Sequence, residues 1–403
     1  KTVNGGVIYG GTGSRNGDVV SGSGVYVDDG GTFTMTGGNI VGCAVTIERV
    51  QAQGGGVYVA ENGTFTMTGG SIAGCTAIAA QLNAYAMGGG ICNEGTTTLS
   101  GTAEIRECRI THAGNLIGGG IYDSGVLNIS GDVKITGCRA EGLETEALYT
   151  NIGGTIDGGT FDGSVWSHST ITGGTFNGEV INSNTITDGT FKGKVTNGGP
   201  ISGGMFYGGI TEGGVIRGCT VTYKNGDADY AMQVLQSSSA ATRPIAPTGS
   251  SGKTFLGWYN GEEKYDFTQP VTENLTLTAK WAQDHIHCIC GGANDVGDHS
   301  THSDITWTAW TSTDSLPTAA GSYYLVNDVT LTYDLDTSFE WKVKENINLC
   351  LNGKTVSTNG TFASVEGSAI FSLTDCTGGG KVFGGSDYFE MEFIGFRGRL
   401  NAM

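Results

Sequence analysis

The sequence predicts a mainly β protein that begins with a parallel β-solenoid, continues with a small separate domain and ends in a second solenoid-like region. Three observations predict this class. A pattern of thirty to thirty-four residues recurs over residues 1–150, an unvarying fifteen-residue period follows over residues 151–215, and both repeats stop near Cys219. Repeats of this kind are typical of solenoids, in which each lap can bury its apolar face only against its neighbours.

The long laps repeat almost letter for letter. GTFTMTGGNIVGC at 31–43 returns as GTFTMTGGSIAGC at 63–75. Each lap holds three β-prone runs, such as GVYVA, TFTMTG and SIAGCTA, separated by glycine corners and one longer polar excursion. Alternation within TFTMT places Phe65 and Met67 on one face and the threonines on the other. Because laps stack about 4.8 Å apart, we expect equal letters to become vertical neighbours.

The short laps carry three apolar columns that share one fifteen-residue spacing. Such a lap is too short for three five-residue strands with corners, so we expect a flattened lap of two strands and a narrower solenoid. The phenylalanine column predicts an aromatic ladder in a dry core. The columns are Ile156, Ile171, Ile186 and Ile201; Phe161, Phe176, Phe191 and Phe206; and Val165, Val180, Val195 and Ile210.

Four of the ten cysteines recur once per long lap, at Cys43, Cys75, Cys108 and Cys138. Side chains at equal places in stacked laps have parallel Cα–Cβ vectors, which suits a disulfide poorly. We therefore expect a ladder of small, buried, unoxidised thiols. Such thiols fit a secreted protein from an oxygen-poor habitat.

The lap pattern GGGVYV…GTFTMTGG over residues 1–220 resembles the right-handed β-helix proteins of the pectin-lyase-like superfamily, and more particularly the glycine-rich repeats of bacterial surface adhesins. The right hand is implied by this resemblance and does not follow from the period. The pattern specifies the fold far better than an activity.

A separate module occupies residues 221–282. Its residues predict a strand at 220–224, a helical turn around Tyr230–Leu235, and strands at 253–259 and 274–281. The runs VTYKNG, FLGWY, YDF and PVTENLTLTAKW resemble the internalin-type B-repeat, also called the Listeria–Bacteroides repeat. That resemblance implies a β-grasp-like fold and a spacer or interaction module of bacterial surface proteins. We expect Trp258 and Trp281 to form its core, with exposed contact residues as the alternative.

A linker at 283–304 is rich in cysteine and histidine and predicts a structural zinc site. Zinc prefers tetrahedral sets of Cys and His with short spacings. A C-x-C pair and an H-x-x-H pair flank a glycine-rich turn, and the alternative is a histidine-rich hinge that binds nothing. The predicted ligands are Cys288, Cys290, His299 and His302, with His285 or His287 as substitutes for one of them.

The last region, 305–403, is again lap-like, because Leu349 returns as Leu373 and Cys350 returns as Cys376 after nearly equal intervals. It resembles the first laps of a second β-helix in gut-bacterial surface proteins. The irregular tail DYFEMEFIGFRGRLNAM is either a cap over an open solenoid end or the remnant of a truncated reading frame.

Composition limits the partners. The formal charge of −18 is spread along the chain, and a diffuse acidic surface repels phosphate backbones, so we expect no nucleic-acid partner. No apolar run is long enough to span a membrane. The start at Lys1 without a signal-like segment predicts either an intracellular protein or a piece of a longer processed one; the resemblances favour an extracellular or cell-surface location, with signal and anchor outside this segment.

The predicted function is a non-enzymatic, adhesin-like presentation of a rigid β-helix to glycans or to host or bacterial proteins. The alternative is a carbohydrate-active β-helix enzyme, either a polysaccharide lyase or a glycoside hydrolase. Such chemistry needs clustered carboxylates, or a basic residue with calcium-binding acids, along one groove. The acids here are scattered, so no catalytic residue is predicted. An ice-binding solenoid with threonine ladders is a third possibility, which the attached repeat domain disfavours.

Overall fold

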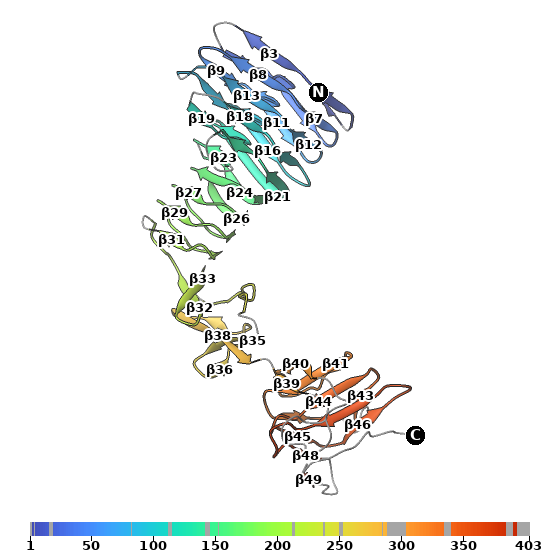
Figure 1. The fold of residues 1–403 in the computed structure, drawn as a ribbon. Coiled ribbons are helices and arrows are strands. Elements are labelled where there is room, and N and C mark those ends of the chain that lie inside the picture. Colours follow the sequence, from blue (N-terminus) through green and yellow to red (C-terminus); the bar gives the residue numbers. More distant parts are fainter. Residues whose placement is uncertain are drawn as a thin grey trace. The chain divides into compact units, whose positions relative to one another are not determined.

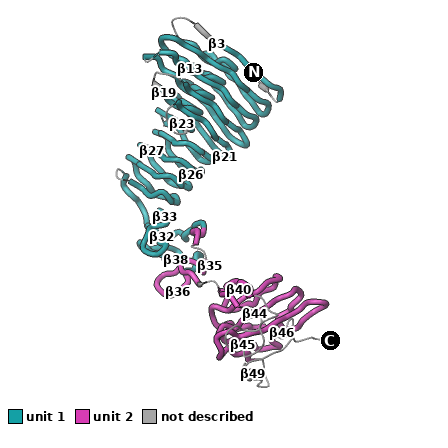
Figure 2. The backbone as a smooth tube through the Cα atoms, viewed as in Figure 1, with its two compact units in different colours: residues 1–245, 265–278 teal, residues 246–264, 279–403 magenta. Residues whose placement is uncertain are grey.

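The computed structural model describes residues 2–3, 5–15, 19–81, 83–111, 115–141, 146–151, 153–211, 214–236, 238–249, 253–283, 285–287, 304–333, 340–383 and 390–392. Over these residues the chain is all β, without a helix (Figure 1). Accordingly, this part of the chain contains no helix of the length and apolarity needed to cross a membrane. The chain divides into two compact units, Lys1–Ile245 with Tyr265–Thr278, and Ala246–Lys264 with Ala279–Met403 (Figure 2).

The long laps of the first unit stack as parallel ladders, which confirms the predicted solenoid-like architecture. Thr64, Phe65, Thr66 and Met67 pair in register with Thr32, Phe33, Thr34 and Met35. The largest sheet contains two rows of parallel strands, which both join in β21 (Val126–Thr136). The first row is β1 (Thr2–Val3), β6 (Thr32–Met35), β11 (Thr64–Met67) and β16 (Thr96–Leu99). The second row is β2 (Val7–Tyr9), β7 (Asn39–Val41), β12 (Ser71–Ala73) and β17 (Glu104–Arg106).

The long laps that begin at Val25, Val57 and Ile91 each contain five short strands rather than the three predicted. The run SIAGCTA is divided because Gly74 has a φ of 60°, a left-handed conformation that turns the chain. The polar excursion also forms a strand. These additional rows are β3 (Thr12–Arg15), β8 (Ala44–Ile47), β13 (Thr76–Ala79), β18 (Arg109–Thr111) and β22 (Arg139–Ala140), and then β4 (Val19–Ser21), β9 (Gln51–Gln53), β14 (Tyr85–Met87) and β19 (Asn115–Ile117).

A nine-stranded parallel sheet runs through both the long and the short laps. Its strands carry apolar residues inward, such as Val57 and Val165, both fully buried. The strands are β5 (Val25–Val27), β10 (Val57–Val59), β15 (Ile91–Asn93), β20 (Ile121–Asp123), β23 (Glu146–Thr150), β25 (Ser164–Ser167), β27 (Val180–Asn182), β29 (Val195–Asn197) and β31 (Ile210–Thr211).

Each short lap contains two strands, as predicted, and in the later laps the isoleucine column pairs separately as isolated bridges. Glycines with φ between 87° and 132°, at 159, 174, 189 and 204, bend the chain between the isoleucine and phenylalanine columns. Each column can then pair separately within one short lap. The isoleucines Ile171, Ile186 and Ile201 form isolated parallel bridges. The remaining strands are β24 (Thr155–Phe161), β26 (Thr170–Phe176), β28 (Thr190–Phe191) and β30 (Gly204–Phe206).

The phenylalanine column forms the predicted aromatic ladder. Neighbouring rings of Phe161, Phe176, Phe191 and Phe206 lie 4.8, 4.8 and 4.7 Å apart and within 4° of parallel. All four side chains are fully buried. The ring spacing equals the spacing between laps, so the ladder follows directly from the fifteen-residue period.

The cysteine column is free and buried, as predicted. The thiols of Cys75, Cys108 and Cys138 lie 3.7, 3.6 and 3.8 Å from isoleucine carbonyl oxygens of the preceding lap. Each thiol therefore has an acceptor across the lap interface, and the column packs within the same core as the apolar residues.

A second inward column, two residues beyond the apolar one in the nine-stranded sheet, is buried and becomes polar from Asn93 onward. Asn93, Asn182 and Asn197 each donate a side-chain hydrogen bond to the carbonyl two residues further on. Asp123 stands in this column, fully buried, and its Oδ1 accepts from Asn93 at 2.5 Å. Within the described part of the chain, its Oδ2 has no hydrogen-bond partner. Burial is the main reason that the pKa of this carboxyl is raised from 3.8 to about 6.

Replacing Asp123 by asparagine is expected to stabilise the solenoid above pH 6. Burial favours the protonated carboxyl of Asp123, so the folded state loses stability when this group ionises. The free energy of unfolding therefore falls by about 3 kcal/mol as the pH rises from about 4, the pKa in the unfolded chain, through about 6, the pKa in the folded chain. An amide can donate to the carbonyl two residues on, as its column neighbours do. We expect Asp123→Asn to raise the free energy of unfolding at pH 7.5 by about 1–3 kcal/mol and to flatten its pH dependence, measured by urea unfolding. Exposed Glu61→Gln is the control, and equal pH profiles for Asp123→Asn and the parent would contradict the assignment.

The solenoid sheet continues into the following module. Strand β33 (Ala228–Leu235) pairs antiparallel with β30 and with β32 (Cys219–Asn225), and β32 pairs parallel with β38 (Leu275–Gln283). The helical turn predicted at Tyr230–Leu235 was therefore wrong, because pairing on both edges fixes this segment as a strand. Two short strands, β34 (Ser239–Ala240) and β37 (Pro270–Val271), pair antiparallel.

The second unit begins with the hairpin of β35 (Lys253–Asn260) and β36 (Glu263–Lys264). Trp258 is buried and its ring lies 5.5 Å from that of Phe255, while Trp281 is half-buried and lies 5.3 Å from the same ring. The interpretation of these tryptophans as core residues holds for Trp258.

Three parallel ladders form the rest of the second unit and confirm its lap-like pattern, with Leu349 opposite Leu373. They are preceded by β39 (His285–His287), which pairs antiparallel with β40 (Ile305–Trp310). A short strand of the tail, β49 (Glu390–Glu392), pairs antiparallel with β48 (Lys381–Phe383). The ladders are β40 (Ile305–Trp310), β41 (Gly321–Leu325), β44 (Ile347–Cys350) and β47 (Phe371–Thr374); β42 (Val329–Leu331), β45 (Thr355–Thr358) and β48 (Lys381–Phe383); and β43 (Glu340–Val343) with β46 (Thr361–Val365).

Candidate metal centre

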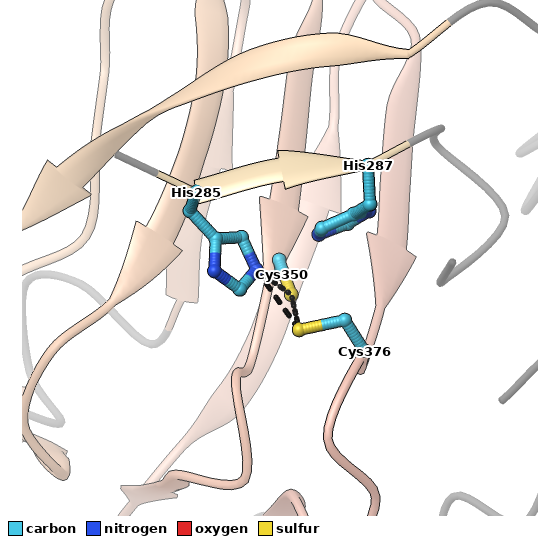
Figure 3. A group of neighbouring side chains, drawn as sticks. All are labelled: His285, His287, Cys350 and Cys376. Carbon is cyan, nitrogen blue, oxygen red and sulfur yellow. Dashed lines mark hydrogen bonds between the residues drawn. The ribbon is translucent and has the colours of Figure 1, made fainter. Parts of the chain in front are cut away.

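Two histidines and two cysteines meet in the second unit. The ligand atoms of His285, His287, Cys350 and Cys376 all lie within 4.8 Å of one another. Figure 3 shows both imidazoles on one short strand, facing the two thiols. The residues come from three segments, because the cysteines follow the first histidine by 65 and 91 positions in the sequence.

Strand alternation places both histidines on the same side of β39. His285 and His287 are two residues apart and point inward, whereas Ile286 between them is 62% exposed. The antiparallel pairing of β39 with β40, with His285 opposite Trp307, sets the strand beside the ladder. The backbone carbonyl of His287 accepts a hydrogen bond of 2.9 Å from the Trp307 indole.

The cysteines lie at the ends of two adjacent strands of the ladder, Cys350 within its strand and Cys376 just beyond its strand. Cys350 is the last residue of β44 and is opposite Thr374 at the end of β47, so Cys376 lies two residues beyond that end. The two sulfur atoms are 3.4 Å apart. Cys350 is fully buried and Cys376 is half-buried. The two thiols therefore lie side by side although Cys376 is two residues beyond the ladder partner of Cys350.

Aromatic rings hold the imidazoles in place. The ring of His285 stacks on Tyr324 at 4.6 Å, and the ring of His287 stacks on Trp307 at 4.5 Å. The two imidazoles meet edge to face at 4.6 Å. This packing orients both side chains before any ligand arrives, which reduces the entropy lost on binding.

The distances between the ligand atoms are close to those of a four-coordinate site. The Nε2 of His285 lies 2.9 Å from the Cys376 sulfur and 3.7 Å from the Cys350 sulfur. A tetrahedral zinc with two sulfur and two nitrogen ligands holds those atoms about 3.4–3.8 Å apart. Small side-chain shifts would bring the present set to that geometry. A Cys₂His₂ set favours zinc over magnesium or calcium, which prefer oxygen ligands.

The electrostatics of the cluster favour a thiolate. The neighbouring Cys350 thiol and the two imidazoles lower the pKa of Cys376 to about 5, against the opposing effect of burial. The same partnership and burial raise the pKa of Cys350. Burial lowers the pKa of His285, which favours the neutral imidazole that a metal needs. Metal ligands must be deprotonated, so one thiolate and one neutral imidazole are already favoured here.

The structure supports a candidate metal site in this region but does not test the predicted set of four ligands. The two predicted substitute ligands, His285 and His287, belong to the cluster. Cys288, Cys290, His299 and His302 lie outside the described residues, and their role stays a prediction. Cys350 and Cys376 had been noted only for their lap spacing. Their sequence spacing indicates that they lie near each other in adjacent laps, but nothing in the sequence places them beside His285 and His287.

One family match supports the sequence interpretation. Residues 220–280 match the model of the Listeria-Bacteroides repeat domain. The comparisons with curated proteins and with solved structures found no match. The matched repeat is typical of bacterial surface proteins.

Proposed function

We propose that this chain is part of a non-enzymatic, secreted or cell-surface bacterial protein, in which a right-handed β-helix of the pectin-lyase-like type presents a rigid face to glycans or proteins. The observation that carries the proposal is the attachment of the matched repeat domain to the solenoid. Its first hairpin continues the solenoid sheet through the pairing of β33 with β30. A binding surface mounted on such a continuous sheet would be held rigidly.

A glycan array combined with an assay for new reducing ends tests this proposal. We expect binding to a limited set of glycans without release of reducing ends from pectins or mucins. Turnover of a polysaccharide would contradict the non-enzymatic function and favour a carbohydrate-active enzyme. Absence of glycan binding, together with capture of a defined bacterial or host surface protein, would place the ligand among proteins.

We also propose that the His₂Cys₂ cluster holds a structural zinc ion that fastens β39 to the ladder of the second unit. The observation that carries it is the convergence of four ligand atoms within 4.8 Å from three separate segments. Four protein ligands leave no open position for a substrate, which is typical of structural rather than catalytic zinc. The zinc would supply a cross-link between β39 and the ends of β44 and β47.

Metal analysis of purified protein, with two pairs of variants, identifies the ligands. We expect one zinc per chain, lost in Cys350→Ser and Cys376→Ser and retained in Cys219→Ser, a buried cysteine of the first unit. Loss of zinc in Cys288→Ser or Cys290→Ser, with retention in Cys376→Ser, would assign the metal to the linker instead. A native preparation with well under one zinc per chain would contradict both assignments.

A further inference from the structure

A groove crosses the outer face of the largest sheet where the long laps give way to the short ones. It has a volume of about 530 Å³. It spans four successive laps, from the turn before β17 through β21 and β24 to β26. The lining residues are Thr102, Glu104, Gly131, Asp132, Lys134, Gly159, Thr160, Gly174 and Thr175.

The change in lap length creates the groove. Between β21 and β24 the register shifts, because Gly131 is opposite Gly158 whereas Lys134 is opposite Thr160. The long lap therefore has one more residue than the short lap at this corner, and Asp132 lies on its exposed side. Beyond the step, Gly159 and Gly174 have φ of 87° and 102° and present no side chain. Glycine within a strand often marks a place where a ligand approaches the backbone closely.

The side chains that line the groove are all polar. The lining consists of three glycines, three threonines, two carboxylates and one lysine, without an aliphatic or aromatic side chain. Pockets for apolar small molecules are lined mainly by apolar side chains, so this groove suits a ligand rich in hydroxyl groups. Threonine hydroxyls donate and accept, carboxylates accept, and lysine donates, which together satisfy the hydroxyl groups of a sugar.

The charged side chains at the groove favour neutral sugars over anionic ones. Glu104 lies 3.9 Å from Lys134 and 3.9 Å from Arg106, so the only lysine of the groove is engaged by one carboxylate. With Asp132, the two carboxylates and the two cations at the groove balance locally, whereas the whole chain has a net charge of −18. Because Lys134 and Arg106 are both paired with Glu104, neither is free to bind the carboxylate of a uronic or sialic acid, and the net negative charge of the chain disfavours such acids at low salt. A neutral glycan has no such penalty.

The groove also has a direction. Glu104, Lys134, Thr160 and Thr175 are successive partners in one outward column of the parallel ladder. Their spacing is that of the laps, about 4.8 Å per step. A linear chain lying along the solenoid axis would meet an equivalent position on each lap.

We propose that this groove binds a neutral, linear oligosaccharide laid along the solenoid axis. The inference rests on the proposed function and assigns its glycan ligand to one surface. Asp132 and Glu104 accept hydrogen bonds from sugar hydroxyls at the long-lap wall, and Thr160 and Thr175 contact the chain over the glycine floor.

Isothermal titration of the full chain tests the groove, with cellohexaose and maltohexaose as neutral probes and hexagalacturonate as the anionic one. We expect a neutral hexamer to bind and hexagalacturonate not to bind at physiological salt. Thr175→Trp, which fills the groove, and Asp132→Ala should each weaken binding at least tenfold. Thr66→Trp, at an outward position of the same sheet in the long laps, is the matched control and should leave affinity unchanged. Circular dichroism establishes that each variant is folded. If Thr175→Trp does not fold, the affinity of Asp132→Ala alone tests the groove.

The outcomes separate the groove from the general function. Neutral hexamer binding that is equal in the parent, Thr175→Trp and Asp132→Ala would overturn the groove and leave a glycan-binding surface elsewhere. Preference for hexagalacturonate would overturn the neutral ligand. If none of the three probes binds but glycans of other classes bind on an array, only the assignment of the ligand to this groove is overturned. If no glycan binds at all, the glycan part of the proposed function is contradicted as well.

Discussion

Phe176→Ala is expected to lower the free energy of unfolding of the solenoid by about 3–5 kcal/mol, the range for removing a buried phenylalanine ring. The ring is fully buried and stacks on Phe161 and Phe191 at 4.8 Å on both faces. Its loss leaves a cavity that neighbouring laps cannot close, because the backbone ladders on either side fix the lap spacing. Urea unfolding followed by circular dichroism measures the change.

Thr190→Ala is the matched control for this substitution. Thr190 belongs to the outward column beside the same ladder and is half-buried. We expect its replacement to change the free energy of unfolding by less than about 0.5 kcal/mol, as for ordinary surface sites. A Phe176→Ala protein that unfolds at the same urea concentration as the parent would show that the column is not core.

Removal of zinc is expected to have the second large effect, confined to the second unit. A ligand that binds only the folded state at a thousandfold its dissociation constant contributes about 4 kcal/mol. For a unit of this size we expect a chelator to lower the melting temperature of the corresponding transition by on the order of 10 °C. Calorimetry with and without chelator measures it, and the transition of the solenoid should not move.

Cys376→Ser should lower the melting temperature of the second unit as the chelator does, and the chelator should then have no further effect. Cys219→Ser, which replaces a buried thiol of the first unit, provides the comparison. A chelator effect that is the same in Cys376→Ser and in the parent would show that the stabilising metal is not bound by this cluster.

Much of the solenoid could be predicted because the spacing of the sequence repeats determines which residues pair between laps. Equal letters recur at a fixed spacing, so Phe65 is paired with Phe33 and Phe176 with Phe191 without knowledge of any long-range contact. The strand count per lap was harder, because a single left-handed glycine such as Gly74 divides one β-prone run into two strands. The local sequence also led to a wrong prediction of a helical turn at Tyr230–Leu235, because pairing of β33 on both edges fixes this segment as a strand.

The metal centre could be predicted only in part, because half of it depends on contacts between distant segments. His285 and His287 form a local pair on one strand face, which a sequence pattern shows. Cys350 and Cys376 join them only because β39 pairs antiparallel with β40 and the ladder then brings β44 and β47 alongside. Proximity in sequence favoured Cys288 and Cys290 instead.

A double-mutant cycle on the aromatic ladder tests the stacked-lap account most directly. Residues in contact show interaction energies of about 0.5–3 kcal/mol, while distant residues are additive within about 0.5 kcal/mol. We expect Phe161→Leu and Phe176→Leu, which are one lap apart and in contact, to be coupled by about 0.5–1.5 kcal/mol. Phe161→Leu and Phe206→Leu, three laps apart, should be additive. Additivity in the first pair, or equal coupling in both, would contradict the parallel stacking of the laps.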